Sequence, residues 1–133
     1  MKNILAIFIG MLFLFSSCQK SPINGNLDGQ WQVMAVTPQP EVELLQTRIY
    51  YCFSLHTCQL SFYGPGPWTA GNILQYTDKS LVLEFPYANS EESVIKLRQY
   101  GINTNPVSFT IETLTKEKMV LRDGDTVVEL RKF

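Results

Sequence analysis

The chain has 133 residues, of which 45% are hydrophobic and 17% charged, and its formal net charge is −1. This length suits one domain, and a domain of this size buries enough surface to fold without a metal ion or a disulfide. A nearly neutral chain with no basic cluster has no electrostatic footprint for nucleic acid, so that class of partner is not expected.

The first 17 residues have the layout of a secretory signal peptide. Lys2 supplies a short positive segment, and residues 4–15 form an apolar run that only Gly10 interrupts. A helix needs about 20 apolar residues to span a bilayer core. The run is shorter than that, so it predicts a signal peptide over residues 1–17 and not a membrane span.

Cys18 directly follows two small residues, Ser16 and Ser17. The stretch LFSSC resembles the lipobox of bacterial lipoproteins, in which the cysteine becomes the first residue of the mature protein and carries acyl chains. The resemblance implies lipidation of Cys18 and a membrane as partner, because more than one acyl chain gives stable anchoring. An ordinary cleavable signal is the alternative. Removal of the signal would leave 133 − 17 = 116 residues.

Residues 18–26, CQKSPINGN, are polar and contain Pro and Gly, which predicts a tether ahead of a folded domain at 27–133. That domain opens with LDGQWQVMAV, whose apolar alternation through Trp31 predicts a first strand. Residues 40–48, PEVELLQTR, are compatible with a short helix that has Pro40 near its start.

Residues 48–63, RIYYCFSLHTCQLSFY, are rich in aromatic and β-branched side chains and predict strand. The apolar face changes from odd to even positions between Leu55 and Cys58. This change predicts a β-bulge near His56 and Thr57. A tight turn is not expected, because SLHT has no Gly, Pro, Asn or Asp.

The second half of the chain reads as strands separated by clear turns. GPGP at 64–67 ends the preceding strand, and residues 69–85 form two strands around a turn at 77–79. Residues 107–113 alternate cleanly. Asp123-Gly124 between two apolar runs predicts a tight hairpin. In that register Lys118 would lie opposite Glu129.

Residues 90–101 are the best candidate for a helix in the mature chain. Ser90 is a suitable N-cap, two glutamates follow it in the first turn, and Gly101 can end the helix. The mature chain is therefore mostly β, with seven or eight strands and one or two short helices. A sandwich and a closed barrel both fit this count.

Two stretches resemble lipocalins and favour the barrel. The Gly-x-Trp of LDGQWQV, Gly29 and Trp31, is similar to the first-strand signature of that family. Residues 109–133 resemble the final strands of small lipocalin-like lipoproteins of Gram-negative bacteria. The resemblance implies an all-β, up-and-down antiparallel barrel in which Trp31 closes the base and Arg131 packs against it.

The same resemblance implies a non-enzymatic protein without a cofactor that binds a small apolar ligand. It also implies the outer membrane as location, with the periplasmic face favoured because QKSP after Cys18 lacks an acidic run. The alternative is a structural or interaction module, since a narrow eight-stranded barrel can be filled by its own side chains. The candidate ligand-binding residues are aromatic: Tyr51, Phe53, Phe62, Trp68, Phe85 and Phe109.

Cys52, His56 and Cys58 lie within seven residues and invite a chemical interpretation. One continuous strand, rising about 3.3 Å per residue, separates the two cysteines by roughly 20 Å. That distance is too long for a disulfide or a shared metal ion, and strand neighbours do not form a Cys–His dyad. We expect free thiols, buried or half-buried. A loop over 53–57 would instead bring the cysteines together as a disulfide in an oxidising compartment.

Overall fold

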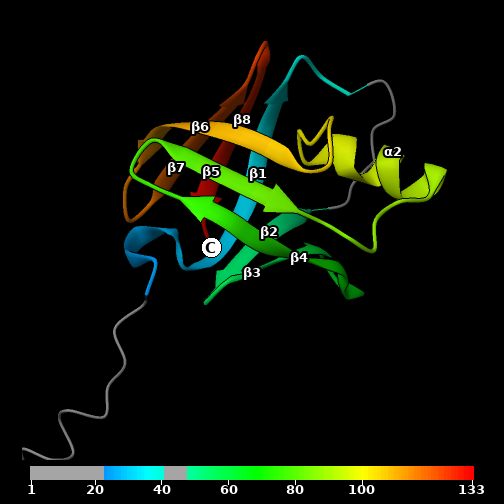
Figure 1. Cartoon of the computed structure of the whole chain (residues 1–133), viewed down its shortest axis with the longest axis horizontal. Coiled ribbons are helices and arrows are strands. Elements are labelled where there is room, and N and C mark those ends of the chain that lie inside the picture. The colour runs from blue at the N-terminus through cyan, green and yellow to red at the C-terminus, as the bar shows by residue number, and fades with distance from the viewer. Residues whose placement is uncertain (1–22, 41–47) are drawn as a thin grey trace, which may run out of the picture.

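The computed structural model describes residues 23–40 and 48–133. Within these ranges eight antiparallel strands follow one another around a closed barrel, and the last strand pairs back onto the first (Figure 1). The predicted up-and-down barrel is thus confirmed, and the sandwich is wrong. The strands are β1 (Gly29–Thr37), β2 (Ile49–Ser54), β3 (Thr57–Phe62), β4 (Gly66–Tyr76), β5 (Ser80–Glu84), β6 (Val107–Leu114), β7 (Lys118–Asp123) and β8 (Thr126–Lys132).

Several predictions fall on residues outside the described ranges. They are the signal peptide at 1–17, the lipidated Cys18 with most of the tether at 18–26, and most of the possible helix at 40–48.

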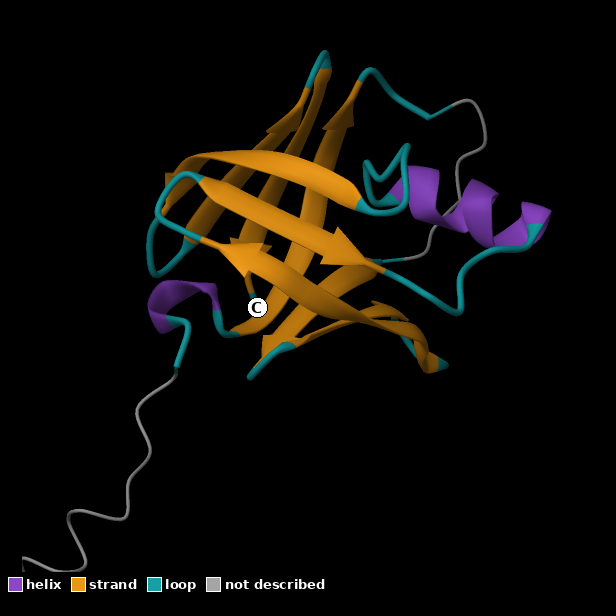
Figure 2. Cartoon of the chain, in the orientation of Figure 1, coloured by secondary structure: helices purple, strands orange, loops and turns teal. Residues whose placement is uncertain are grey.

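In the described part of the chain two helices lie at opposite ends of the barrel, the 3-10 helix η1 (Gly25–Leu27) at one end and α2 (Glu91–Gln99) at the other (Figure 2). The predicted caps of α2 are confirmed. The Ser90 hydroxyl accepts a hydrogen bond from the Ser93 amide at 3.1 Å, and Gly101 follows the helix with a φ of +79°. Such a cap satisfies a backbone donor that the first turn leaves unpaired.

Alternate residues of the strands point into the barrel and form its core. Val107, Phe109 and Ile111 of β6 are buried, and so are Leu81 and Leu83 of β5. This is the period of two that the sequence shows, and it confirms the alternation predicted for residues 107–113. Each fully buried large apolar side chain contributes roughly 1.5–3 kcal/mol, so this core dominates the stability of the barrel.

A tight hairpin stands where one bulged strand was predicted. Ser54 pairs with Thr57, so that only Leu55 and His56 form the turn. Leu55 has a φ of +56°, at the position where a type II′ turn normally has glycine. The prediction of a bulge near His56 and Thr57 is therefore wrong. A two-residue turn also changes the parity of the buried face, which is why the pattern was compatible with both structures.

The hairpin between β7 and β8 is confirmed, but its register is two residues from the predicted one. Gly124 and Asp125 form the turn, with Gly124 at a φ of +59°. Lys118 therefore pairs with Arg131 and not with Glu129, which lies opposite Val120. A shift of two residues leaves the same side chains facing the core, so the apolar pattern could not distinguish the two registers.

Candidate functional site

Trp31 closes the end of the barrel at which η1 lies. Its side chain is fully buried, and its Nε1 donates a hydrogen bond to the Leu27 carbonyl at 2.8 Å. The Lys132 ammonium lies 4.3 Å from the centre of the Trp31 ring and donates hydrogen bonds to the carbonyls of Asn26 and Asp28. Burial lowers the pKa of Lys132. We call this arrangement the closed end.

The cation that packs on Trp31 is thus Lys132, and the prediction of Arg131 for this role is wrong. Arg131 is exposed and lies opposite Gln32 and Lys118. The sequence held the signal for the correct residue, because Lys132 continues the alternation of the buried Val128 and Leu130.

Gly29 of the Gly-x-Trp motif has a role in the same place. Its φ is +121°, and a Cβ added there would lie 3.1 Å from Lys132 Nζ. A side chain would strain the backbone and press on the lysine that covers Trp31.

Four of the six predicted ligand-binding residues belong to the core. Tyr51, Phe53, Phe85 and Phe109 are each at most 1% exposed. Side chains that line a cavity large enough for water would keep accessible surface, so these rings fill the interior that they were predicted to line. The sequence could not decide this, because an inward-facing aromatic residue looks the same in a filled barrel and in a hollow one.

The other two, Phe62 and Trp68, are partly buried at the opposite end and lie under α2. Their rings are stacked with centres 6.0 Å apart. The ammonium of Lys96, from α2, lies 5.2 Å from the centre of the Trp68 ring and 5.9 Å from that of Phe62. Trp68, predicted to bind a ligand, is therefore partly covered by Lys96 of α2.

Tyr100, which sequence reasoning missed, fastens α2 to the barrel. Its hydroxyl donates to the Ser61 carbonyl at 2.7 Å and accepts from Trp68 Nε1 at 3.1 Å. Its own carbonyl accepts from the Tyr51 hydroxyl at 2.5 Å. Burial raises the pKa of both tyrosines, so the two phenols are neutral donors.

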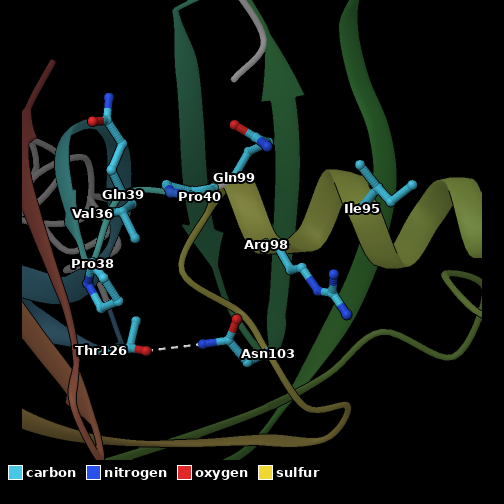
Figure 3. A pocket seen from close by; sticks show the side chains of 9 residues that line it. All are labelled: Val36, Pro38, Gln39, Pro40, Ile95, Arg98, Gln99, Asn103 and Thr126. Atoms are coloured by element: carbon cyan, nitrogen blue, oxygen red, sulfur yellow. Dashed lines mark hydrogen bonds between the residues drawn. The ribbon is translucent and has the colours of Figure 1, made fainter. Parts of the chain in front are cut away.

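A pocket of about 240 Å³ lies where the end of β1, α2 and the start of β8 meet (Figure 3). We call it the open-end pocket. Figure 3 shows the residues around β1 on one side and those of α2 on the other, and below them the Asn103 amide donates a hydrogen bond to the Thr126 hydroxyl at 2.9 Å. The lining residues are Val36, Pro38, Gln39 and Pro40, then Ile95, Arg98 and Gln99 of α2, and finally Asn103 and Thr126.

Gly101 sets how closely the chain that follows α2 approaches β8. A Cβ at this position would lie 2.2 Å from Val128 Cγ2, far inside contact distance. Only glycine fits this close approach at a φ of +79°. The lining of the open-end pocket is a mixture of apolar side chains and neutral hydrogen-bonding groups. Arg98 is its one charged residue among those described.

The two cysteines of the β2–β3 hairpin are free thiols, one buried and one half-buried, as predicted. Cys52 pairs with Gln59 on the outer face, while Cys58 lies opposite Phe53 inside the barrel. The alternative disulfide is not formed, because the side chains point to opposite faces of the sheet. Burial raises the pKa of both thiols, which keeps them protonated.

His56 is exposed in the turn of that hairpin, whereas Cys58 is enclosed in the core. The described residues contain no group of three or more His, Cys, Asp or Glu side chains that could hold a metal ion. None of the described helices is long and apolar enough to cross a bilayer.

Comparison with known proteins agrees with this architecture. Residues 13–133 match the family model described as a lipocalin-like domain. A lipocalin-like protein from Bacteroides uniformis ATCC 8492 is 21% identical, with a TM-score of 0.57 over 82% of this chain and 100% of its own. An uncharacterized protein from Bacteroides eggerthii DSM 20697 is 20% identical, with the same TM-score over 80% of this chain and 98% of its own. No curated protein matches significantly. At these identities the structures support the fold alone.

Proposed function

Because this chain belongs to the lipocalin-like domain family, we propose that it is a non-catalytic binding protein of the bacterial envelope. In this proposal acylated Cys18 holds it to the outer membrane on the periplasmic side, and the open-end pocket takes up a small ligand. The observation that carries the proposal is the contrast between a filled interior and a hollow beside α2.

The lining of the pocket defines the chemistry of its ligand. The carbons of Val36, Pro38 and Ile95 favour an apolar body, while the guanidinium of Arg98 favours an anionic group. Pockets for drug-sized ligands usually measure about 300–1,000 Å³, so this one suits a smaller molecule or one end of a larger one. A small amphipathic carboxylate combines the two features.

Membrane anchoring is supported by the LFSSC stretch and by the place at which the domain begins. The described chain starts at Ile23 beside η1, at the end of the barrel remote from α2 (Figure 1). A lipid on Cys18 would therefore leave the open-end pocket directed away from the membrane. Substitution Cys18→Ala should release the protein from membranes, and incorporation of labelled fatty acid should be lost with it.

Calorimetric titration with octanoate, compared with uncharged 1-octanol, tests the ligand site. Octanoate should bind more tightly than octanol, and Arg98→Gln should remove this preference by weakening octanoate about tenfold, the loss of one charged hydrogen bond. Arg131→Gln serves as control, because that exposed arginine lies on the last strand near the closed end.

A second candidate is a structural or interaction module that binds no small molecule. The filled interior favours it, since the aromatic residues leave no room among themselves. If the titration shows no saturable heat for octanoate, or an equal loss in both arginine variants, the open-end pocket is not a ligand site and this candidate replaces the first.

A further inference from the structure

Leu55 occupies an unfavourable place for a leucine. It is 61% exposed at the tip of the β2–β3 hairpin, and it is the one described residue other than glycine with a positive φ. Left-handed backbone is costly for a residue with a Cβ and free for glycine. Packing within the described fold does not account for a large apolar side chain there, so a contact outside the fold is the simplest physical reason for it.

Two further exposed apolar residues lie next to this hairpin. The side-chain amide of Asn24 donates a hydrogen bond to the Leu55 carbonyl at 2.7 Å. This bond brings Ile23, the residue before Asn24, to the hairpin, and Ile23 is 58% exposed. On the other side the Ile73 amide donates to the His56 carbonyl at 2.8 Å, and Leu74, which follows Ile73, is 53% exposed. We call Ile23, Leu55 and Leu74 the apolar tip.

Only a short stretch of chain connects the proposed lipid anchor to the apolar tip. From Cys18 to Ile23 there are 23 − 18 = 5 residue steps, which span at most about 18 Å when fully extended. An acylated Cys18 sits at the membrane surface, so the chain cannot carry Ile23 farther than this from the lipid. The closed end, with η1 and the hairpin, is thus the end of the barrel held against the membrane (Figure 1).

We propose that the apolar tip contacts the lipid surface in which Cys18 is anchored, an inference that rests on the lipid anchor of the proposed function. The acyl chains bring the tip to the surface, and burial of its exposed side chains then fixes the orientation of the barrel. The neighbouring turns carry both signs of charge, at Asp78 and Lys79 and at Lys116 and Glu117. Neutral lipid is therefore the expected surface, without a requirement for anionic headgroups.

The test uses the mature acylated protein in phosphatidylcholine vesicles with brominated acyl chains, which quench nearby tryptophan. Leu55→Trp and Ile23→Trp place a reporter in the apolar tip, the second one outside the strained turn. Tyr87→Trp is the matched control, because Tyr87 is 82% exposed in the segment between β5 and α2, at the opposite end.

After subtraction of the wild-type emission, the added fluorescence at positions 55 and 23 should shift to the blue and fall at least twofold in brominated vesicles. The emission at position 87 should not change. If the protein floats with the vesicles but all three reporters behave alike, the anchor stands and the tip contact is wrong. If the acylated protein does not float with vesicles at all, both the anchor and the inference that rests on it are wrong.

Discussion

The two ends of the barrel are closed by different means. At the closed end one buried ring, Trp31, is held by Lys132 and by the Leu27 carbonyl, and the residues involved lie within a few positions of the two ends of the domain. At the other end a helix lies over Phe62 and Trp68 and leaves a pocket beside it. The packed Trp31 leaves no room for a ligand at the closed end. The helix at the other end rests on only a few side chains, and space for a ligand remains beside it.

The largest effect is expected where α2 meets the barrel. Gly101→Ala should lower the free energy of unfolding by about 2–4 kcal/mol, because the new Cβ would collide with Val128 while the backbone stays left-handed. Gly25→Ala is the control from the closed end. Gly25 has a φ of +57°, but nothing lies within 4 Å of an added Cβ. Gly25→Ala should therefore lower the free energy of unfolding by only about 1 kcal/mol.

Urea denaturation of both glycine variants measures the difference. Equal losses would mean that the chain after α2 can move away from β8 at no cost in stability. Restoration of part of the loss by Val128→Ala in the Gly101→Ala background would identify the clash as the cause.

A smaller effect is expected at the closed end. Lys132→Met keeps the apolar stem but removes the ammonium from Trp31 and from two carbonyls, so it should cost about 1–2 kcal/mol. Arg131→Met should stay within about 0.5 kcal/mol of the wild type, because that side chain is exposed. Thermal unfolding of both variants decides which cation supports Trp31, and a larger loss for Arg131→Met would reverse the assignment.

The smallest expected effect is an increase in the stability of the barrel. Leu55→Gly relieves the left-handed backbone at the hairpin tip and should raise the stability of the barrel by up to about 1 kcal/mol, the gain being reduced by the entropy of the unfolded glycine. A loss of stability in chemical denaturation would show that Leu55 packs within the fold. In that case its exposure would no longer call for a membrane contact.

Both strand-turn errors have the same physical origin. Side chains alternate along a strand, so a two-residue turn at Leu55 and His56 and a bulge both change the buried parity. The two registers of the last hairpin likewise bury the same residues. A pattern of apolar positions indicates which face of a strand is buried. It cannot distinguish turns, bulges or registers that bury the same face.

The sequence by itself determined the all-β class, the helix between Ser90 and Gly101, and the buried face of β6, because these follow from local backbone preference and a period of two. Its first-strand Gly-x-Trp also indicated the family. Only the tertiary structure decided that Lys132 covers Trp31, that Tyr100 joins α2 to the barrel, and that the aromatic residues fill the interior. Those outcomes depend on which distant side chains come into contact and on how much space remains between them. Local sequence determines neither of these.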